Sequence, residues 1–251
     1  MVREETVFGP IFSRRLGSSL GINLLPVNGK ICNFDCIYCE CGWNKDGRDD
    51  TRLPRAAEVR EALEAKLKRL VDDGTPVDTI TFSGDGESTL NPDFPQIIDD
   101  TLALRDRYYP SAKVSVLSNA TQAHRPDVFA ALRKVDNPIM KLDAPTNELV
   151  AKINQPAAGY DVGRVVEALM QFNGDFILQT MFLKSKDFDS SSPETLSGWM
   201  DIVRLLKPRE VMAYTLDRPT PEEGLQKFTV EEMNTFLKPL IQEGFNVQVK
   251  G

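Results

Sequence analysis

Histidine is the scarcest functional side chain of this sequence, with a single copy, His124, in 251 residues. Zinc sites usually combine two pairs of Cys or His ligands separated by a structured stretch of chain. One histidine cannot supply a second pair, so we do not expect a zinc site of the finger type.

Long apolar runs are also missing. No window approaches 18 uncharged apolar residues, and residues 1–15 contain neither an apolar core of seven residues nor a small-residue cleavage site. We therefore expect no membrane span and no signal peptide, and we predict a cytoplasmic protein.

Basic side chains are fewer than acidic ones, 30 against 37, and the formal net charge is −7. Proteins that bind along nucleic-acid phosphates depend on basic surface. Long nucleic acid is therefore the least favoured class of partner.

Cysteine is absent outside one short stretch. All four copies, Cys32, Cys36, Cys39 and Cys41, lie within the sequence ICNFDCIYCECG at residues 31–42. Disulfide frameworks join distant segments, whereas these four cysteines could join only one another. The grouping favours a metal or cluster site over a disulfide scaffold.

Short apolar runs alternate with segments of helical period along the rest of the chain. The runs with strand-like length and β-branched content are residues 19–26, 77–84, 113–119, 137–143, 175–184 and 209–217, and residues 245–251 could add a shorter strand. Such alternation predicts parallel βα units with right-handed crossovers, in a doubly wound sheet or a barrel. With 41% apolar residues, we expect one α/β domain over residues 1–251.

The intervening segments carry signals for helices. Residues 56–74 space their apolar positions three and four apart and end with a glycine. Near the C-terminus, Thr229 and Glu232 have the spacing of a capping box, and Pro239 predicts a kink or two short helices.

The spacing of Cys32, Cys36 and Cys39 is C-x3-C-x2-C. Bacterial ferredoxins surround a cluster with four thiolates for electron transfer. Three thiolates can hold a [4Fe–4S] cluster and leave one iron open, which is the coordination that a catalytic metal centre keeps.

These cysteines, with the aromatic Tyr38 directly before the last of them, resemble the signature of the radical S-adenosylmethionine (SAM) superfamily. The resemblance implies a partial (β/α)6 TIM-type barrel with parallel strands and outer helices, in which this loop follows the first strand. The barrel core would cover about residues 17–217, followed by a C-terminal helix and possible strand within 229–251. A [4Fe–4S] cluster and SAM would be the cofactors.

Further matches follow the expected strands, at the end where barrel active sites collect. The sequence SGDGEST resembles the superfamily's SAM-binding glycine motif, although Ser88 stands where the family usually has proline. The resemblance implies SAM contacts for Tyr38, Gly84, Asp85, Gly86, Glu87, Ser118, Asn119, Lys141, Asp143 and Gln179. Among these, Glu87 would bind the methionine ammonium, Lys141 the carboxylate and Asp143 the ribose. Taken singly, each also fits an ordinary βα loop or a strand-end ion pair.

Residues 9–26 and 214–224 add a narrower resemblance, to a group of radical SAM Fe–S oxidoreductases distantly similar to wyosine-forming tRNA enzymes. It makes Arg14, Arg15, Asp217 and Arg218 candidates for substrate handling, since guanidinium groups suit an anionic substrate. Arg14 and Arg15 could equally seal the barrel rim. Cys41 alone cannot build the auxiliary cluster that the wyosine enzymes use, which argues against their reaction.

The implied activity is reductive cleavage of SAM to a 5′-deoxyadenosyl radical that abstracts hydrogen from a substrate, with electrons from a flavodoxin- or ferredoxin-type donor. The substrate stays open between a small molecule, a peptide and a partner protein activated by a radical, with RNA less favoured. Cys41 could donate to the cluster, react with a substrate radical, or pack beside the loop as an inert thiol. A non-enzymatic alternative is an Fe–S electron carrier that uses Cys41 as its fourth ligand.

Overall fold

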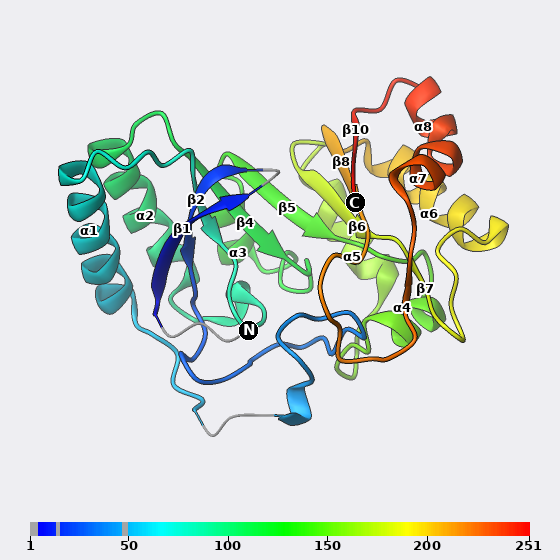
Figure 1. Cartoon of the computed structure of the whole chain (residues 1–251), viewed down its shortest axis with the longest axis horizontal. Coiled ribbons are helices and arrows are strands. Elements are labelled where there is room, and N and C mark those ends of the chain that lie inside the picture. Colours follow the sequence, from blue (N-terminus) through cyan, green and yellow to red (C-terminus); the bar gives the residue numbers. More distant parts are fainter. Residues whose placement is uncertain (1–4, 14–15, 47–49) are drawn as a thin grey trace. The chain divides into compact units, whose positions relative to one another are not determined.

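The computed structural model describes residues 5–13, 16–46 and 50–251. Its contacts divide the chain into two compact units, and each is described by itself. Unit 1 comprises residues 1–32, 44–118 and 125–138, and unit 2 comprises residues 33–43, 119–124 and 139–251. Figure 1 shows the elements along the chain.

The strands of unit 1 form a mostly parallel ladder. They are β1 (Val7–Ser13), β2 (Gly17–Ile22), β3 (Thr79–Phe82) and β4 (Lys113–Ser118). Strand β1 pairs antiparallel with β2, while β2, β3 and β4 run parallel, with Ile22 opposite Phe82 and Phe82 opposite Val116. All of β3 is buried, as expected for an inner parallel strand.

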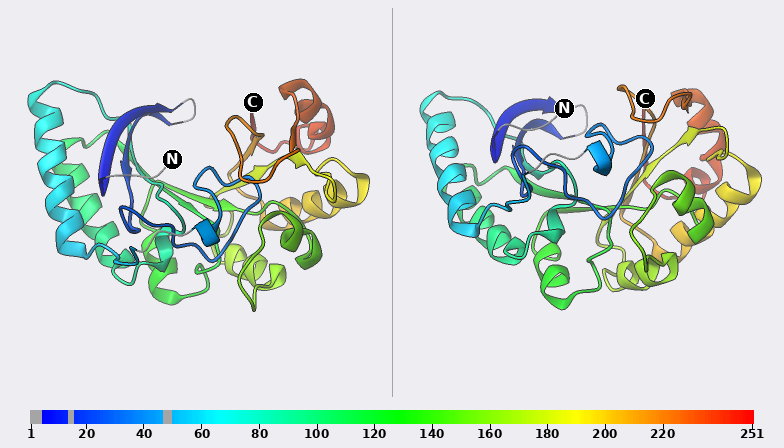
Figure 2. Two further views of the ribbon diagram at one scale, coloured as in Figure 1. Left: turned by 60° about the horizontal axis from the view of Figure 1, so that its bottom comes forward. Right: turned by 90° about the horizontal axis from the view of Figure 1, so that it is seen from below.

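Helices cover this ladder on its outer side (Figure 2). They are α1 (Ala56–Asp72), α2 (Phe94–Tyr108) and α3 (Pro126–Leu132), with short 3-10 turns at Asn44–Asp46 (η1) and Ser88–Leu90 (η2). Helix α1 buries Val59, Leu63, Leu67 and Leu70, one stripe at a spacing of three or four residues. The stripe explains why α1 packs beside α2.

The strands of unit 2 form a second parallel ladder. It contains β5 (Asn137–Lys141), of which Ile139 onward belongs to this unit, β6 (Ile177–Met181), β8 (Glu210–Tyr214) and β10 (Val247–Lys250). The pairs β5–β6, β6–β8 and β8–β10 are all parallel. A separate short pair joins β7 (Leu183–Lys184) to β9 (Gln226–Lys227).

Helices of unit 2 follow its strands. They are α4 (Asn147–Ile153), α5 (Val162–Met170), α6 (Pro193–Leu206), α7 (Val230–Phe236) and α8 (Lys238–Gln242). Trp199 of α6 is buried, and its indole N–H donates to the Leu142 carbonyl at 3.2 Å and to the Thr180 hydroxyl at 3.1 Å. The donation fixes the helix on the ends of β5 and β6 because a buried indole needs a partner.

The expected α/β class with parallel strands and outer helices is confirmed, and so are the capping box at Thr229 and the division at Pro239 into α7 and α8. Besides the short turns η1 and η2 and the two-residue strand β9, strand β1 and helix α4 were not expected. Strand β1 contains a Gly-Pro pair, which is typical of a turn. Helix α4 has seven residues and lacks the first-turn proline or capping box that marks α3 and α7, which are equally short. The single domain over residues 1–251 stays a prediction.

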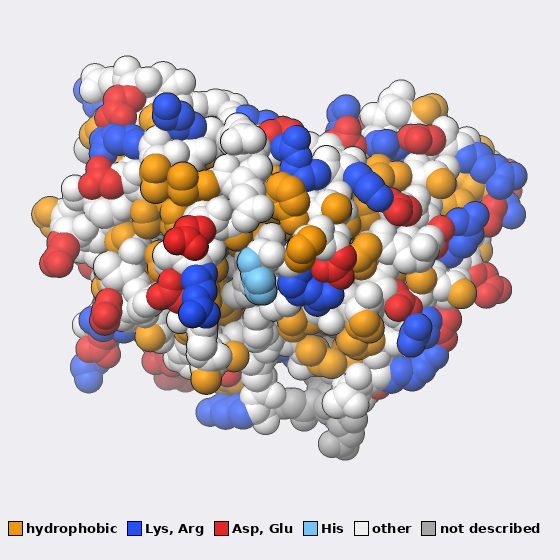
Figure 3. Space-filling view, turned by 180° about the vertical axis from the view of Figure 1, so that it is seen from behind, with side chains coloured by type: hydrophobic (Ala, Val, Ile, Leu, Met, Phe, Trp, Pro, Cys, Tyr) orange, Lys and Arg blue, Asp and Glu red, His pale blue; other side chains and the backbone are white. Residues whose placement is uncertain are grey.

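Among the helices of residues 5–13, 16–46 and 50–251, none combines the length and apolar character needed to cross a bilayer. Figure 3 shows basic and acidic side chains interspersed over one face. That face carries no large field of one sign.

Asp136 ties α2 to β4 within unit 1. Its carboxylate accepts the Val114 N–H at 2.9 Å, Arg105 Nη1 at 2.9 Å and Lys113 Nζ at 3.2 Å. Burial alone would raise the pKa of Asp136, but the Val114 N–H and the Arg105 guanidinium outweigh it and hold the pKa below its ordinary 3.8. The ionised form therefore stabilises the fold.

Replacing this carboxylate by an amide, Asp136→Asn, should cost about 1–2 kcal/mol of unfolding free energy at pH 7. The contribution of a carboxyl with a lowered pKa is complete above the unfolded value and is lost as the pH falls through the folded one. Urea unfolding across pH should therefore show the two proteins converging below pH 3.8. Asp127→Asn, at an exposed pair with Arg125, is the control and should change stability less. An equal effect of both variants would contradict this role.

Candidate active site in the cysteine loop and at the strand ends

The cysteine loop, residues 31–42, contains two successive turns. The Cys39 N–H donates to the Cys36 carbonyl, and the Gly42 N–H donates to the Cys39 carbonyl, each at 3.0 Å. Gly42 has φ +82°, a conformation that a side chain would strain. All four cysteines are half-buried, and none of them forms a disulfide.

Cys32 ends unit 1, whereas Cys36, Cys39 and Cys41 belong to unit 2. Over the described ranges, no three His, Cys, Asp or Glu side chains converge on a point where one metal ion could sit. The cysteines present separate thiols along a loop.

The C-terminal end of α4 holds the backbone of this loop. The last carbonyls of a helix lack partners inside it. Here the Ile153 carbonyl accepts the Ile37 N–H at 2.9 Å, and the Asn154 carbonyl accepts the Asp35 N–H at 2.9 Å. The Ala157 N–H donates back to the Asn33 carbonyl at 2.8 Å. The helix end thus fixes the path of the chain on both sides of Cys36.

The side chain of Asn154 reaches the same loop. It is 1% exposed, and its Nδ2 lies 2.7 Å from Asp143 Oδ2, 3.0 Å from the Tyr38 hydroxyl and 3.4 Å from Cys36 Sγ. The Tyr38 hydroxyl donates to the same Asp143 oxygen. Asn154 therefore links Cys36 to Asp143, which lies just after β5.

Asp143 is the centre of this network. Its side chain has no exposed surface, its Oδ1 accepts the Met181 N–H at 2.8 Å, and Lys141 Nζ lies 3.5 Å away. Lys141 Nζ donates to the Tyr214 hydroxyl and lies 5.0 Å and 4.7 Å from the ring centroids of Tyr38 and Tyr214. A buried carboxylate needs several such donors.

Electrostatics keeps the groups of the network in defined protonation states. Burial would lower the pKa of Lys141, but Asp143 and Tyr214 overcome it and the pKa is raised, so the ammonium stays charged. Burial, and then Asp143, raise the pKa of Tyr38, which therefore remains a donor. Burial raises the pKa of Cys36 to about 11 against the opposing Asn154 hydrogen bond, so the thiol keeps its proton at neutral pH.

The glycine-rich segment after β3, residues 83–89, is held by hydrogen bonds within unit 1. Asn23, at the end of β2, accepts the Asp85 N–H at 3.2 Å through its side-chain oxygen. The Ile31 N–H donates to the Asp85 carbonyl at 3.2 Å, and the Glu87 N–H donates to the Ile31 carbonyl at 3.0 Å. Gly86 lies in this close approach with φ +139°, and a Cβ there would lie 1.9 Å from the Ile31 carbonyl oxygen. The glycine-rich segment thereby sets where the chain enters the cysteine loop.

Glu87 and Ser118, expected to share a site, do meet in unit 1. The carboxylate of Glu87 accepts the Ser118 hydroxyl at 2.9 Å and the Thr89 N–H at 3.1 Å, and it is buried. The second contact caps the short helix η2. The ends of β3 and β4 are joined through this acid.

Asn119 binds the cysteine loop from the other side. Its Nδ2 donates to Asn33 Oδ1 at 2.7 Å, and the Thr121 hydroxyl donates to Asn119 Oδ1 at 2.7 Å. Asn33 Nδ2 completes the triangle with a 2.7 Å bond to the Thr121 hydroxyl. The contact places Asn119 against the residue that follows Cys32.

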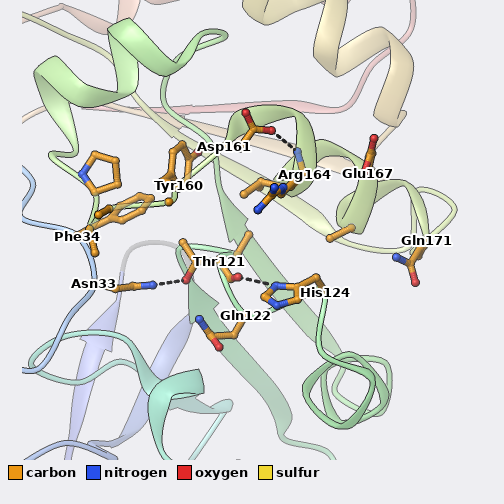
Figure 4. A pocket seen from close by; sticks show the side chains of 17 residues that line it. Asn33, Phe34, Thr121, Gln122, His124, Tyr160, Asp161, Arg164, Glu167 and Gln171 are labelled. Carbon is orange, nitrogen blue, oxygen red and sulfur yellow. Dashed lines mark hydrogen bonds between the residues drawn. The ribbon is translucent and has the colours of Figure 1, made fainter.

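A pocket of about 510 Å³ opens beside this triangle in unit 2 (Figure 4). Phe34 and Tyr160 form an edge-to-face pair on one side, with centroids 5.3 Å apart. His124 and Arg164 lie on the opposite side, and His124 Nδ1 is 2.9 Å from the Thr121 carbonyl oxygen. His124 is exposed.

The remaining candidate residues are placed as follows. Arg218 Nη1 pairs with Glu40 of the cysteine loop at 2.5 Å on exposed side chains, and Asp217 is exposed. Gln179 of β6 lies in register with Lys141 and is buried. Arg14 and Arg15 lie outside the described residues.

Comparison with known proteins decides the family. The family model described as "Radical SAM superfamily" matches residues 29–183, which include the cysteine loop, the glycine-rich segment and the network around Asp143. The chain belongs to the radical SAM superfamily.

Two relatives show how this radical SAM chain compares in length. A protein named GTPase Obg from Brachyspira hyodysenteriae is 30% identical over 92% of this chain, which spans only 33% of that protein. A UPF0026 protein from Synechocystis is 30% identical over 88% of this chain and 78% of its own length. The UPF0026 match supports the narrower, poorly characterised group expected from residues 9–26 and 214–224.

Solved structures share the fold. A radical SAM methyltransferase from Sphaerobacter thermophilus matches with a TM-score of 0.68 at 18% identity, over 96% of this chain and 67% of that one. Streptococcus suis SuiB, solved with S-adenosylmethionine and also with its precursor peptide SuiA, matches with TM-scores of 0.64 and 0.66 at 15% and 16% identity. Both comparisons with SuiB cover 89% of this chain, and 49% and 47% of the SuiB chain respectively. The expected radical SAM architecture is confirmed.

Sequence reasoning missed four polar residues that hold these segments, Asn23 in unit 1 and Asn33, Asn154 and Tyr214 in unit 2. Asn23, Asn154 and Tyr214 follow or end a strand or helix, and a polar residue at such a point is the signal that could have drawn attention to them. Asn33 lies in the loop between the cysteines and carries no such signal. Asn154 was missed because the helix before it was missed.

Gly86 gives a direct test of the entry to the cysteine loop. Gly86→Ala should reduce the unfolding free energy by about 3 kcal/mol, because it adds backbone overlap to an unfavourable φ. Gly74→Ala is the matched control: φ is +65° and a Cβ would meet nothing within 4 Å, so about 1 kcal/mol is expected. Denaturant unfolding measures both, and equal losses would contradict the close approach at Ile31.

Proposed function

We propose that this chain is a radical SAM enzyme that binds a [4Fe–4S] cluster through Cys32, Cys36 and Cys39 and cleaves SAM reductively. The observation that carries the proposal is the C-x3-C-x2-C loop, whose cysteines are half-buried and outside disulfides, and which the end of α4 holds beside a buried lysine–carboxylate pair. The donor set fits the cluster, since thiolates are the ligands that iron–sulfur clusters use. The cluster would supply the electron that breaks the sulfonium of SAM and yields a 5′-deoxyadenosyl radical.

The chain's own residues orient the cofactors in this proposal. Lys141 stays charged and would bind the carboxylate of SAM, and Glu87 would bind its ammonium. Tyr38, Gly84, Asp85, Gly86, Ser118, Asn119 and Gln179 complete the proposed SAM contacts. The ribose contact of Asp143 stays a prediction, and its complete burial gives it a second role, that of holding Lys141 and Tyr38 in place.

The proposed substrate is a small molecule, a peptide or a partner protein. A flavodoxin- or ferredoxin-type protein would supply the electrons. Arg218 would bind an anionic group of the substrate in place of Glu40. The Arg218–Glu40 pair is exposed to solvent, so it is weak enough to be broken. Arg14 and Arg15 are further candidates of the same kind. We place the reaction in the cytoplasm.

Cysteine variants test the cluster and separate the roles of the four thiols. After anaerobic reconstitution with SAM and dithionite, Cys36→Ala should lose bound iron and all formation of 5′-deoxyadenosine. Cys41→Ala is the matched control, and it should keep both, because a three-thiolate site does not need it. Iron content and chromatography of the nucleoside give the answer.

Loss of iron in Cys41→Ala would favour a four-thiolate electron carrier instead. Full iron without 5′-deoxyadenosine in the wild type would contradict the proposed reaction. A candidate substrate that raises the rate of 5′-deoxyadenosine formation would begin to identify the target.

Lys141 tests SAM binding separately from the cluster. Lys141→Met should weaken SAM binding by about tenfold to a hundredfold, since a charge-assisted bond is worth about 1.5–3 kcal/mol, while iron stays bound. Lys184→Met is the control, because Lys184 also lies over a ring, that of Phe228, and near a carboxylate. Equilibrium binding of SAM to reconstituted protein measures both, and equal affinities would exclude this role for Lys141.

A further inference from the structure

We propose that Asn154 is a positioning residue that donates a side-chain N–H to the sulfur of Cys36 and thereby raises the reduction potential of the bound cluster. The inference rests on the proposed function, because it assumes the cluster. It assigns a role to a residue outside the cysteine loop and outside the expected SAM contacts.

The orientation of the Asn154 amide follows from its surroundings. An ionised carboxylate only accepts hydrogen bonds. Since Asp143 Oδ2 lies 2.7 Å from one end of the amide, that end must be the nitrogen. The same nitrogen is 3.4 Å from Cys36 Sγ, so the group facing the sulfur is a donor.

The arrangement leaves the amide little freedom. Asn154 is 1% exposed, and its backbone carbonyl accepts the N–H of Asp35, the residue before Cys36. Asp143 is itself fixed by the Met181 N–H, by Tyr38 and by Lys141. The donor therefore sits on a buried frame and does not depend on solvent.

An amide with two N–H groups faces three acceptors, which are Asp143, the Tyr38 oxygen and Cys36. Tyr38 already donates to Asp143, and a thiolate bound to iron carries negative charge, so it competes well for the second N–H. Hydrogen bonds to the sulfurs are among the terms that set the potential of such clusters. Reduction adds an electron and makes the sulfur a stronger acceptor, so the bond favours the reduced state.

Removal of the donor should make the cluster harder to reduce. In reconstituted Asn154→Leu, the ratio of reduced to oxidised cluster at a fixed potential should fall about tenfold, a shift of about 59 mV to more negative values for one electron. The readout is a redox titration followed by electron paramagnetic resonance, which does not depend on turnover. Iron and sulfide content must equal those of the wild type.

Gln155→Asn is the matched control, because Gln155 contacts the loop through its backbone carbonyl, which accepts the Asp35 N–H at 3.2 Å. Its potential should equal that of the wild type. Tyr38→Phe removes the bond to Asp143 and keeps Asn154, so its potential should move much less than that of Asn154→Leu. A shift in Tyr38→Phe as large as in Asn154→Leu would overturn the assignment to the N–H of Asn154.

A second variant covers the case in which leucine prevents cluster assembly. Asn154→Ser is small and its hydroxyl is too short to reach both Asp143 and Cys36, so it should show the same negative shift. An exchangeable-proton coupling in electron–nuclear double resonance should be present in the wild type and lost in the variant. An unchanged potential together with an unchanged coupling overturns the inference.

The two levels of the proposal fail in different ways. If wild-type protein assembles no cluster, or reduces it without cleaving SAM, the proposed function fails. If the wild type cleaves SAM and Asn154→Leu and Asn154→Ser keep its potential, only the role of Asn154 fails.

Discussion

The buried carboxylate of Asp143 is the constraint on which the architecture of unit 2 around the cysteine loop depends. With no exposed surface on its side chain, the charge must be matched by donors of the protein itself. It draws Tyr38 and Asn154 onto one oxygen and the Met181 N–H and Lys141 toward the other. Removing any one donor leaves a buried acceptor short of a partner, so the group behaves as one unit.

Backbone contacts around the cysteines accompany this network. Helix α4 ends where its last carbonyls would otherwise be unpaired, and the N–H groups of Asp35 and Ile37 use them. In unit 1 the close approach of Gly86 to Ile31 fixes the residue just before Cys32. Backbone hydrogen bonds therefore hold the residue before Cys32 in unit 1 and the segment around Cys36 in unit 2.

Much of the candidate site could be predicted from short motifs. The C-x3-C-x2-C spacing, the glycine-rich segment after β3 and the Lys-x-Asp pair at the end of β5 are local patterns, and a local pattern is visible in one sequence. The strands around them were predicted because buried parallel strands are continuous apolar runs. Strand β1 was missed because its Gly-Pro pair is typical of a turn, and helix α4 because it is short and lacks a first-turn proline or a capping box.

Short motifs and apolar periodicity were enough to predict the family, the three candidate cluster cysteines and the alternation of strands and helices. The folded chain was needed to show that Asn154 faces Cys36 and that Asp143 is completely buried. It was also needed to show that Arg218 pairs with Glu40. The physical reason is distance along the chain: Asn154 and Cys36 are 118 residues apart, and no periodic pattern connects them. Their contact exists because a buried charge just after β5 has to be surrounded, and only the folded chain shows which donors surround it.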